Sequence, residues 1–137
     1  MNQNNSPKPV DFVDKRKHQR LKIPLAATIK VGDSVTYKGT TRNISFSGTY
    51  ITCNEGPVPE IGTSCVITLT LQEGDEPMTI KFKARVKHFR ESNVGLEFQA
   101  IFAEDYNDFV YLMVNNSSDP DGLLEEISRN PGIKIHT

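Results

Sequence analysis

The chain lacks tryptophan and has only two cysteines, Cys53 and Cys65, and three histidines among its 137 residues. These cysteines and histidines show no metal-ligand spacing, so we expect no metal site. Both cysteines lie in strand-like runs, where a free thiol packs as a small apolar side chain. We therefore expect no disulfide, and reduced thiols agree with a cytoplasmic location.

Long apolar runs and catalytic motifs are also missing. No segment approaches the roughly 18 apolar residues that a membrane-spanning helix needs. The leading MNQNNSPKPV has no apolar core of a secretory signal, so we expect a cytoplasmic protein without membrane insertion. The carboxylates of Asp33, Asp75, Glu91 and Glu97 form no acid–base pair, and there is no G-x-x-x-x-G-K phosphate loop. We expect no enzymatic activity and no cofactor.

What the chain does contain is 36% apolar and 24% charged residues, the composition of one globular domain. Its charge is unevenly distributed. Residues 1–103 carry 14 Lys/Arg and 10 Asp/Glu, a net charge of +4. Residues 104–137 carry two Lys/Arg and seven Asp/Glu, a net charge of −5, which brings the whole chain to −1. The densest basic stretch, residues 15–22, holds five Lys/Arg in eight residues. This cluster suits a compact anion better than long duplex nucleic acid, because the domain as a whole is not basic.

Short segments with alternating side chains predict an antiparallel β-structure, either a barrel or a sandwich. The predicted strands span residues 25–31, 35–42, 48–54, 63–72, 78–88 and 94–99. In residues 78–88, apolar side chains alternate with mainly cationic ones, so that one face should be buried and the other solvated. A turn precedes this strand, and we expect it to form a hairpin with residues 63–72.

The periodicity changes after the sixth strand. Apolar residues recur at helical spacing from Phe102 to Met113, and the acidic Glu104 and Asp105 suit the first turn of a helix. We expect this helix to plug or flank the barrel, and a short amphipathic helix to follow around Leu123. We divide the chain into a flexible N-terminal arm (1–14), a barrel with its helix (15–115) and an acidic C-terminal tail (116–137).

Two short motifs have chemistry suited to an anionic purine ligand. The first is Arg16-x-x-x-Arg20, which alone is also typical of a solvated arm. Arginine can bond phosphate oxygens or the guanine O6/N7 edge and can stack on a ring. The second is N-x-S-x-x-G at residues 43–48, which alone suits an ordinary turn. In it Asn43 offers an acceptor and Ser45 a hydroxyl, while Gly48 lets the backbone approach a purine or adopt a positive φ.

The order of these motifs resembles that of the PilZ domain, a family of receptors for the bacterial second messenger cyclic di-GMP. The resemblance covers about residues 13–115, and the strand Val94-Gly95-Leu96-Glu97-Phe98 is a third agreement. It implies an all-β fold, a six-stranded antiparallel barrel with a C-terminal helix, which binds the messenger on its outer surface. The family often has Asp where this chain has Asn43, and losing that charge would lower affinity modestly.

The resemblance also implies which residues bind the ligand. By the family pattern, the cyclic di-GMP site comprises Arg16, Arg20, Asn43, Ser45 and Gly48. Lys15 either contacts the ligand or only steers it electrostatically. His88 either closes one side of the pocket or is solvated, and for Arg85 we favour a solvated outer face. The ligand binds either as one molecule or as an intercalated dimer.

We therefore expect a monomeric cyclic di-GMP receptor that signals to a protein partner. On binding it should order the segment Arg16–Arg20, which we call the arginine arm. The alternative is a PilZ-like adaptor that binds no nucleotide, which the intact motifs argue against. A barrel binding single-stranded nucleic acid ranks third, because tryptophan is absent and alternation assigns Phe82 and Phe98 to the core. We expect no DNA or RNA partner.

Overall fold

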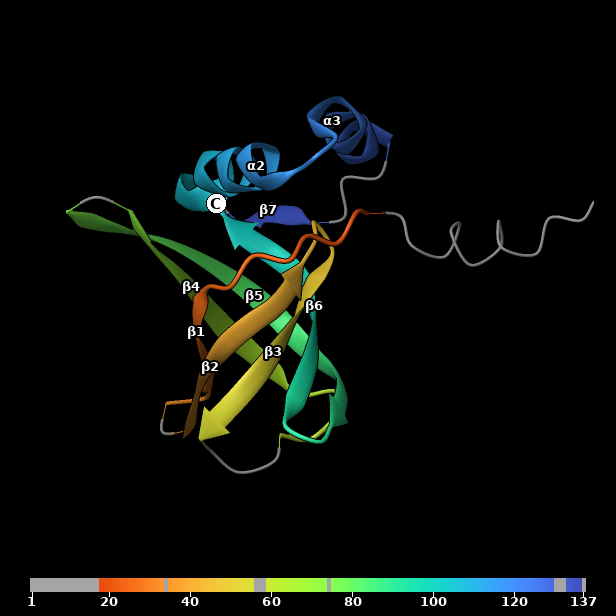
Figure 1. Ribbon diagram of the computed structural model, residues 1–137. Coiled ribbons are helices and arrows are strands. Elements are labelled where there is room, and N and C mark those ends of the chain that lie inside the picture. The colour runs from red at the N-terminus through yellow and green to blue at the C-terminus, as the bar shows by residue number, and fades with distance from the viewer. Residues whose placement is uncertain (1–17, 34, 56–58, 74, 130–132, 137) are drawn as a thin grey trace, which may run out of the picture.

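The computed structural model describes residues 18–33, 35–55, 59–73, 75–129 and 133–136. Strands make up most of these residues, and helices follow them near the C-terminus (Figure 1). The elements in chain order are β1 (Ala26–Val31), β2 (Val35–Ile44), β3 (Gly48–Glu55), β4 (Ser64–Glu73), β5 (Glu76–Arg90), β6 (Asn93–Phe102), α2 (Ala103–Asn116), α3 (Pro120–Arg129) and β7 (Lys134–His136).

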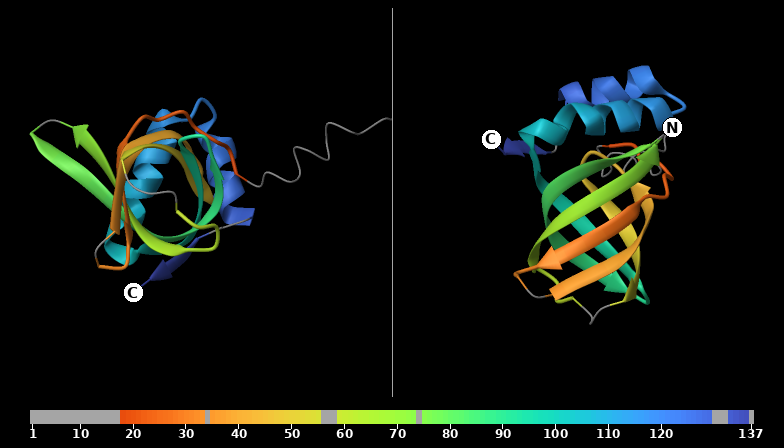
Figure 2. Two further views of the ribbon diagram at one scale, coloured as in Figure 1. Left: turned by 90° about the horizontal axis from the view of Figure 1, so that it is seen from below. Right: turned by 90° about the vertical axis from the view of Figure 1, so that its left-hand side faces the viewer.

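Six antiparallel strands close into a barrel. They are hydrogen-bonded in the order β3-β2-β1-β4-β5-β6, and pairing of β3 with β6 closes the ring. Seen along the barrel axis, the strands surround a common centre, with α2 across one end (Figure 2). The predicted hairpin is present, with β4 and β5 paired from Ser64↔Arg85 to Glu73↔Glu76. The fold class predicted from the sequence is confirmed.

The alternation in β5 explains how this sequence fills the barrel. Ile80, Phe82, Ala84 and Val86 are buried, whereas the residues between them are exposed. Successive side chains of a strand point to opposite faces, so the apolar set points inward together. The rings of Phe82 and Phe98 stack inside with centroids 3.9 Å apart, which confirms that both belong to the core.

Helix α2 covers one end of the barrel with an apolar face (Figure 1). Phe109 on this face is fully buried. Its ring packs edge-on against Phe82, 4.9 Å away between centroids, and against Phe46, 5.0 Å away. The helix predicted from the spacing of apolar residues is confirmed, and it closes an open end that would otherwise expose the core.

The chain after α2 also packs against the rest of the molecule. Helix α3 forms around Leu123, as predicted, and Leu123 is fully buried in the core. Strand β7 then pairs in parallel with β6, from Ala100↔Lys134 to Phe102↔His136. The sequence did not predict β7, because three residues are too few to show an alternation.

Cys53 is half-buried and Cys65 is buried, and both are free thiols. Burial raises the pKa of both thiols, that of Cys65 to about 11, because a thiolate is poorly solvated there. In the part of the chain that the structure describes, no helix has both the length and the apolar character needed to cross a membrane.

Candidate ligand-binding site

A pocket of about 220 Å³ opens on the outer surface of the barrel, over β3, β6 and the end of β5. Its lining consists of Arg20, Asn43, Ser45, Ser47, Gly48, Thr49, Tyr50, Lys87, His88, Gly95, Leu96 and Glu97. The arginine arm and the N-x-S-x-x-G loop, which are separate in sequence, thus meet at one place.

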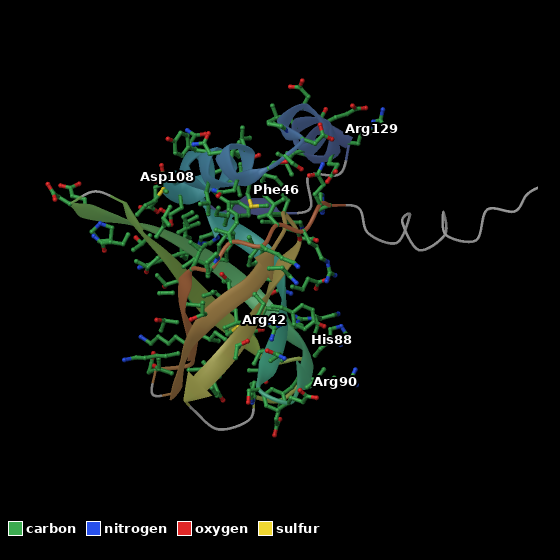
Figure 3. All side chains as sticks on the ribbon, in the orientation of Figure 1. Arg42, Phe46, His88, Arg90, Asp108 and Arg129 are labelled. Atoms are coloured by element: carbon green, nitrogen blue, oxygen red, sulfur yellow. The ribbon has the colours of Figure 1, made fainter. Side chains whose placement is uncertain are left out.

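Most of the residues predicted for the site line this pocket. They are Arg20, Asn43, Ser45, Gly48 and His88. Figure 3 shows His88 at the outer surface of the barrel. Arg16 and Lys15 lie outside the described residues. Arg85 is exposed on β5 and is not part of the lining.

Backbone contacts hold Arg20 beside the pocket. Leu21, the next residue, forms an isolated antiparallel bridge with Ile44, with backbone N···O distances of 2.8 and 2.9 Å. Gln19, the preceding residue, donates its backbone N–H to Glu126 Oε1 of α3 at 2.6 Å. The arm is therefore attached on both sides of Arg20, once to the barrel and once to a C-terminal helix.

His18 provides a third attachment of the arm. Only 6% of its surface is exposed, and its ring packs edge-on against Phe46 with centroids 6.3 Å apart. Phe46 belongs to the N-x-S-x-x-G loop and also packs against Phe109 of α2. The arm, the loop and the capping helix therefore share one packed cluster.

The loop between β2 and β3 is stabilised by its own serine. Ser45 Oγ accepts hydrogen bonds from the backbone N–H groups of Ser47 at 3.1 Å and Gly48 at 3.2 Å. This is the local side-chain-to-backbone bonding that favours serine in turns. Ser45 is only 5% exposed and its hydroxyl shapes the loop, while its predicted role as a donor to the ligand stays a prediction.

Gly48 is required by the neighbouring strand. A Cβ at this position would lie 2.2 Å from the carbonyl oxygen of Leu96 in β6. The glycines with positive φ among the described residues are Gly32 and Gly62, so a positive φ is the wrong explanation for Gly48. The observed constraint is the close approach of the β6 backbone, which the sequence did not reveal, and the predicted approach to a purine stays a prediction.

Two β-bulges bring side chains to the pocket. The pairing of β5 with β6 shifts register between Val86 and His88, and that of β2 with β3 shifts between Thr41 and Asn43. Strict alternation after Val86 would have turned His88 inward. Because a bulge adds a residue and redirects the strand, Lys87 and His88 are both exposed and both line the pocket.

Tyr50 and His88 form a parallel aromatic pair that the sequence did not reveal. Their ring centroids are 6.5 Å apart and their planes differ by 6°. Gly95 is the cross-strand partner of both residues, and a Cβ on it would come within 3.2 Å of both rings. A flat ring stacked between Tyr50 and His88 would need about 3.5 Å on each side, or about 7 Å between the two rings. The observed separation of 6.5 Å is close to this value.

The charged groups of the pocket are arranged around this pair. The guanidinium carbon of Arg20 lies 6.0 Å from the centroid of Tyr50, within the range of a cation–π contact. Lys87 Nζ lies 4.0 Å from Glu97 Oε1, and both side chains are about half exposed. Arg20 and Lys87 can attract an anion, and Asn43 and Glu97 can accept hydrogen bonds from a base.

The protein is thus a small helix-capped barrel with cationic and aromatic side chains around one surface pocket. The PilZ domain family model matches residues 14–114, and the chain belongs to this family. PilZ domains bind cyclic di-GMP or protein partners and act as receptors or adaptors, not as enzymes.

Two solved structures are similar to this chain, and the first of them shares its fold. The inhibitor of motility from Bacillus subtilis (MotI/DgrA) is 20% identical with a TM-score of 0.57, and the match covers 85% of this chain and 51% of that one. The chain thus spans about half the length of this protein. The PilZ domain of CeSA from a cellulose-synthesizing bacterium is 16% identical with a TM-score of 0.48, covering 59% of this chain and 80% of that one. No curated protein matches the chain.

Proposed function

We propose that this domain is a cyclic di-GMP receptor whose ligand binds between the arginine arm and the N-x-S-x-x-G loop. The observation that carries the proposal is the convergence of Arg20 and the loop on one pocket, beside the parallel rings of Tyr50 and His88. Membership of a family of cyclic di-GMP receptors supports the same ligand.

The lining fits a dianionic guanine dinucleotide. Arg20 and Lys87 supply positive charge for a phosphodiester, while Asn43 and Glu97 supply acceptors for guanine N–H groups. The aromatic pair supplies a stacking surface, which contributes about 1–3 kcal/mol per base in single-strand binding proteins.

The size of the pocket defines how much of the ligand it holds. Its volume of about 220 Å³ is smaller than the roughly 300–1,000 Å³ of sites that enclose a whole ligand. The pocket therefore suits one base and an adjoining phosphate, with the rest of the dinucleotide on the barrel surface. We assign this remaining part to Arg16 and to Lys15. Three or four charge-assisted hydrogen bonds, each contributing about 1.5–3 kcal/mol, less the ordering cost, give a Kd of about micromolar.

Calorimetry with cyclic di-GMP tests the proposal and gives the stoichiometry of one or two ligands. We expect Arg16→Ala/Arg20→Ala to weaken binding at least about 100-fold, because two charged contacts are lost. Arg129→Ala/Lys134→Ala is the matched control, since it also removes two positive charges and both residues are exposed outside the pocket lining. Binding that survives the double substitution would refute the site.

We further propose that ligand binding is coupled to the C-terminal helices. His18 and Phe46 connect the arm and the loop to α2, and the hydrogen bond from Gln19 to Glu126 connects the arm to α3. A ligand that binds Arg20 would therefore strengthen these attachments, order the arm further and alter the surface offered to a protein partner. Amide exchange of residues 8–22, with and without cyclic di-GMP, measures this. Equal exchange in both states would reject the coupling.

A further inference from the structure

The outer surface of β1, β4 and β5 carries four exposed cations. Three carboxylates border them: Asp33 lines a hollow beside Lys30 and Lys83, Asp105 accepts a hydrogen bond from the backbone N–H of Lys81, and Glu97 of β6 pairs across the strands with Arg85. We define the cationic face as Lys30 of β1 together with Lys81, Lys83 and Arg85 of β5. Strand β4 lies between β1 and β5. Its outward residues are Ser64, Val66, Thr68 and Thr70, all uncharged.

None of these four cations forms an ion pair with a described residue. Over the described ranges of the chain, the ion pairs are Lys87–Glu97 and Glu125–Arg129. The four cations therefore act together and give this side of the barrel a positive potential. An anionic partner is the electrostatic complement of such a surface.

A hollow of about 470 Å³ lies within the cationic face. Val66 of β4 pairs with Lys30 on one side and with Lys83 on the other, so that two lysines flank an apolar side chain. Ser64 and Gln99 add polar groups to the lining, and Asp33 adds a carboxylate from the turn after β1. The hollow can accept a side chain that carries both methylene groups and a negative charge, as glutamate does.

We propose that the cationic face docks an extended acidic segment of a protein partner. Lys81, Lys83 and Arg85 occupy every second position of β5 and so recur about every 6.8 Å. An extended peptide repeats its own side chains at the same interval, so that Asp or Glu at alternate positions would meet successive cations. None of the four cations lines the nucleotide pocket, and the proposal does not depend on cyclic di-GMP binding.

Other anionic partners fit this surface less well. The outward residues of β1, β4 and β5 next to the cations are Thr, Ser, Ala and Val, with no aromatic ring for a nucleic acid base to stack on. The large exposed apolar residues of the described chain are Ile61, Tyr111, Leu124 and Ile135, none on these strands, so nothing here inserts into a bilayer. β1, β4 and β5 each have two paired neighbours, so a segment must bind through side chains rather than extend the sheet.

Fluorescence anisotropy with a labelled peptide of alternating Glu and Ser tests the proposal at low salt. We expect the peptide to bind the full chain, and Lys81→Glu/Lys83→Glu to weaken binding about tenfold. Lys22→Glu/Lys134→Glu is the matched control, because it changes the net charge equally at exposed positions outside the face. This control should bind within about twofold of the wild type, and binding should weaken as salt screens the charges.

Three results would overturn the assignment. The first is a Gln-Ser peptide that binds as tightly as the Glu-Ser peptide. The second is equal weakening by the matched control, which would indicate a net-charge effect. The third is tighter binding, through the same lysines, of oligo(dT) or of vesicles containing phosphatidylglycerol. Calorimetry with cyclic di-GMP should be unchanged in Lys81→Glu/Lys83→Glu, so failure here is distinguishable from failure of the proposed receptor function.

Discussion

Gly48 and Gly95 line the same pocket but are constrained by different neighbours. A Cβ on Gly48 would meet the Leu96 carbonyl oxygen at 2.2 Å, and that backbone cannot move without disturbing the pairing of β3 with β6. The atoms nearest to a Cβ on Gly95 would be side-chain atoms of Tyr50 and His88, at 3.2 Å. Gly48 is therefore needed for folding, whereas Gly95 sets the space between two rings.

Alanine at each glycine should separate stability from binding. We expect Gly48→Ala to destabilise the domain by about 1–3 kcal/mol, the usual cost of overpacking. Gly95→Ala should leave the free energy of unfolding within about 1 kcal/mol of the wild type, because the rings can shift. It should still weaken cyclic di-GMP binding about tenfold through lost stacking. Urea denaturation and calorimetry measure the two effects, and a Gly95→Ala variant with wild-type affinity would exclude a base between the rings.

At the scale of elements, alternation predicted the strands well and their irregularities poorly. β5 has the predicted buried and exposed residues up to Val86 and then departs from them at a bulge. A bulge depends on the pairing of β5 with β6, which the sequence of β5 alone does not contain. The predictions of Arg20, Asn43 and His88 at one pocket therefore came from motif order and family resemblance, not from periodicity.

The pocket residues that were not predicted from the sequence escaped prediction for one common reason. Tyr50, Lys87, Gly95 and Glu97 line the pocket through cross-strand neighbours that are distant in the sequence. Tyr50 stands out in its strand as a half-buried aromatic residue, but only the register Tyr50↔Gly95↔His88 shows what it contacts. Register across a barrel is set by all its strands together.

Two neighbouring leucines of helix α3 should contribute differently to the stability of the domain. Leu123 is fully buried and Leu124 is 45% exposed, so that adjacent leucines of one helix differ mainly in packing. We expect Leu123→Ala to destabilise the domain by about 2–5 kcal/mol, and Leu124→Ala to change stability by no more than about 0.5 kcal/mol. Urea denaturation of both variants measures the difference. A loss of stability in Leu123→Ala as small as that in Leu124→Ala would show that α3 contributes little to the stability of the barrel.

At the scale of the whole molecule, closure of the barrel could not be predicted from the sequence of any single strand. Six alternating strands were compatible with a barrel or a sandwich, and the resemblance to PilZ domains favoured the barrel. Closure depends on the pairing of β3 with β6, which joins residues 48–52 to residues 93–97. The capping by Phe109 and the packing of Leu123 complete a single core, so unfolding should be one cooperative transition.

The pH dependence of that transition should report the burial of Cys65. This residue is 6% exposed, and its pKa rises from 9.0 to about 11 in the folded state. The folded state therefore retains the thiol proton between pH 9 and 11 while the unfolded state loses it, so stability falls through this window and is unaffected below it. We expect the wild type to lose about 1 kcal/mol more than Cys65→Ala between pH 8 and pH 10. Urea denaturation at both pH values measures this, and comparison with the variant removes the contribution of Lys and Tyr titration. A constant difference between the two proteins across this range would show that the thiol is not buried from solvent.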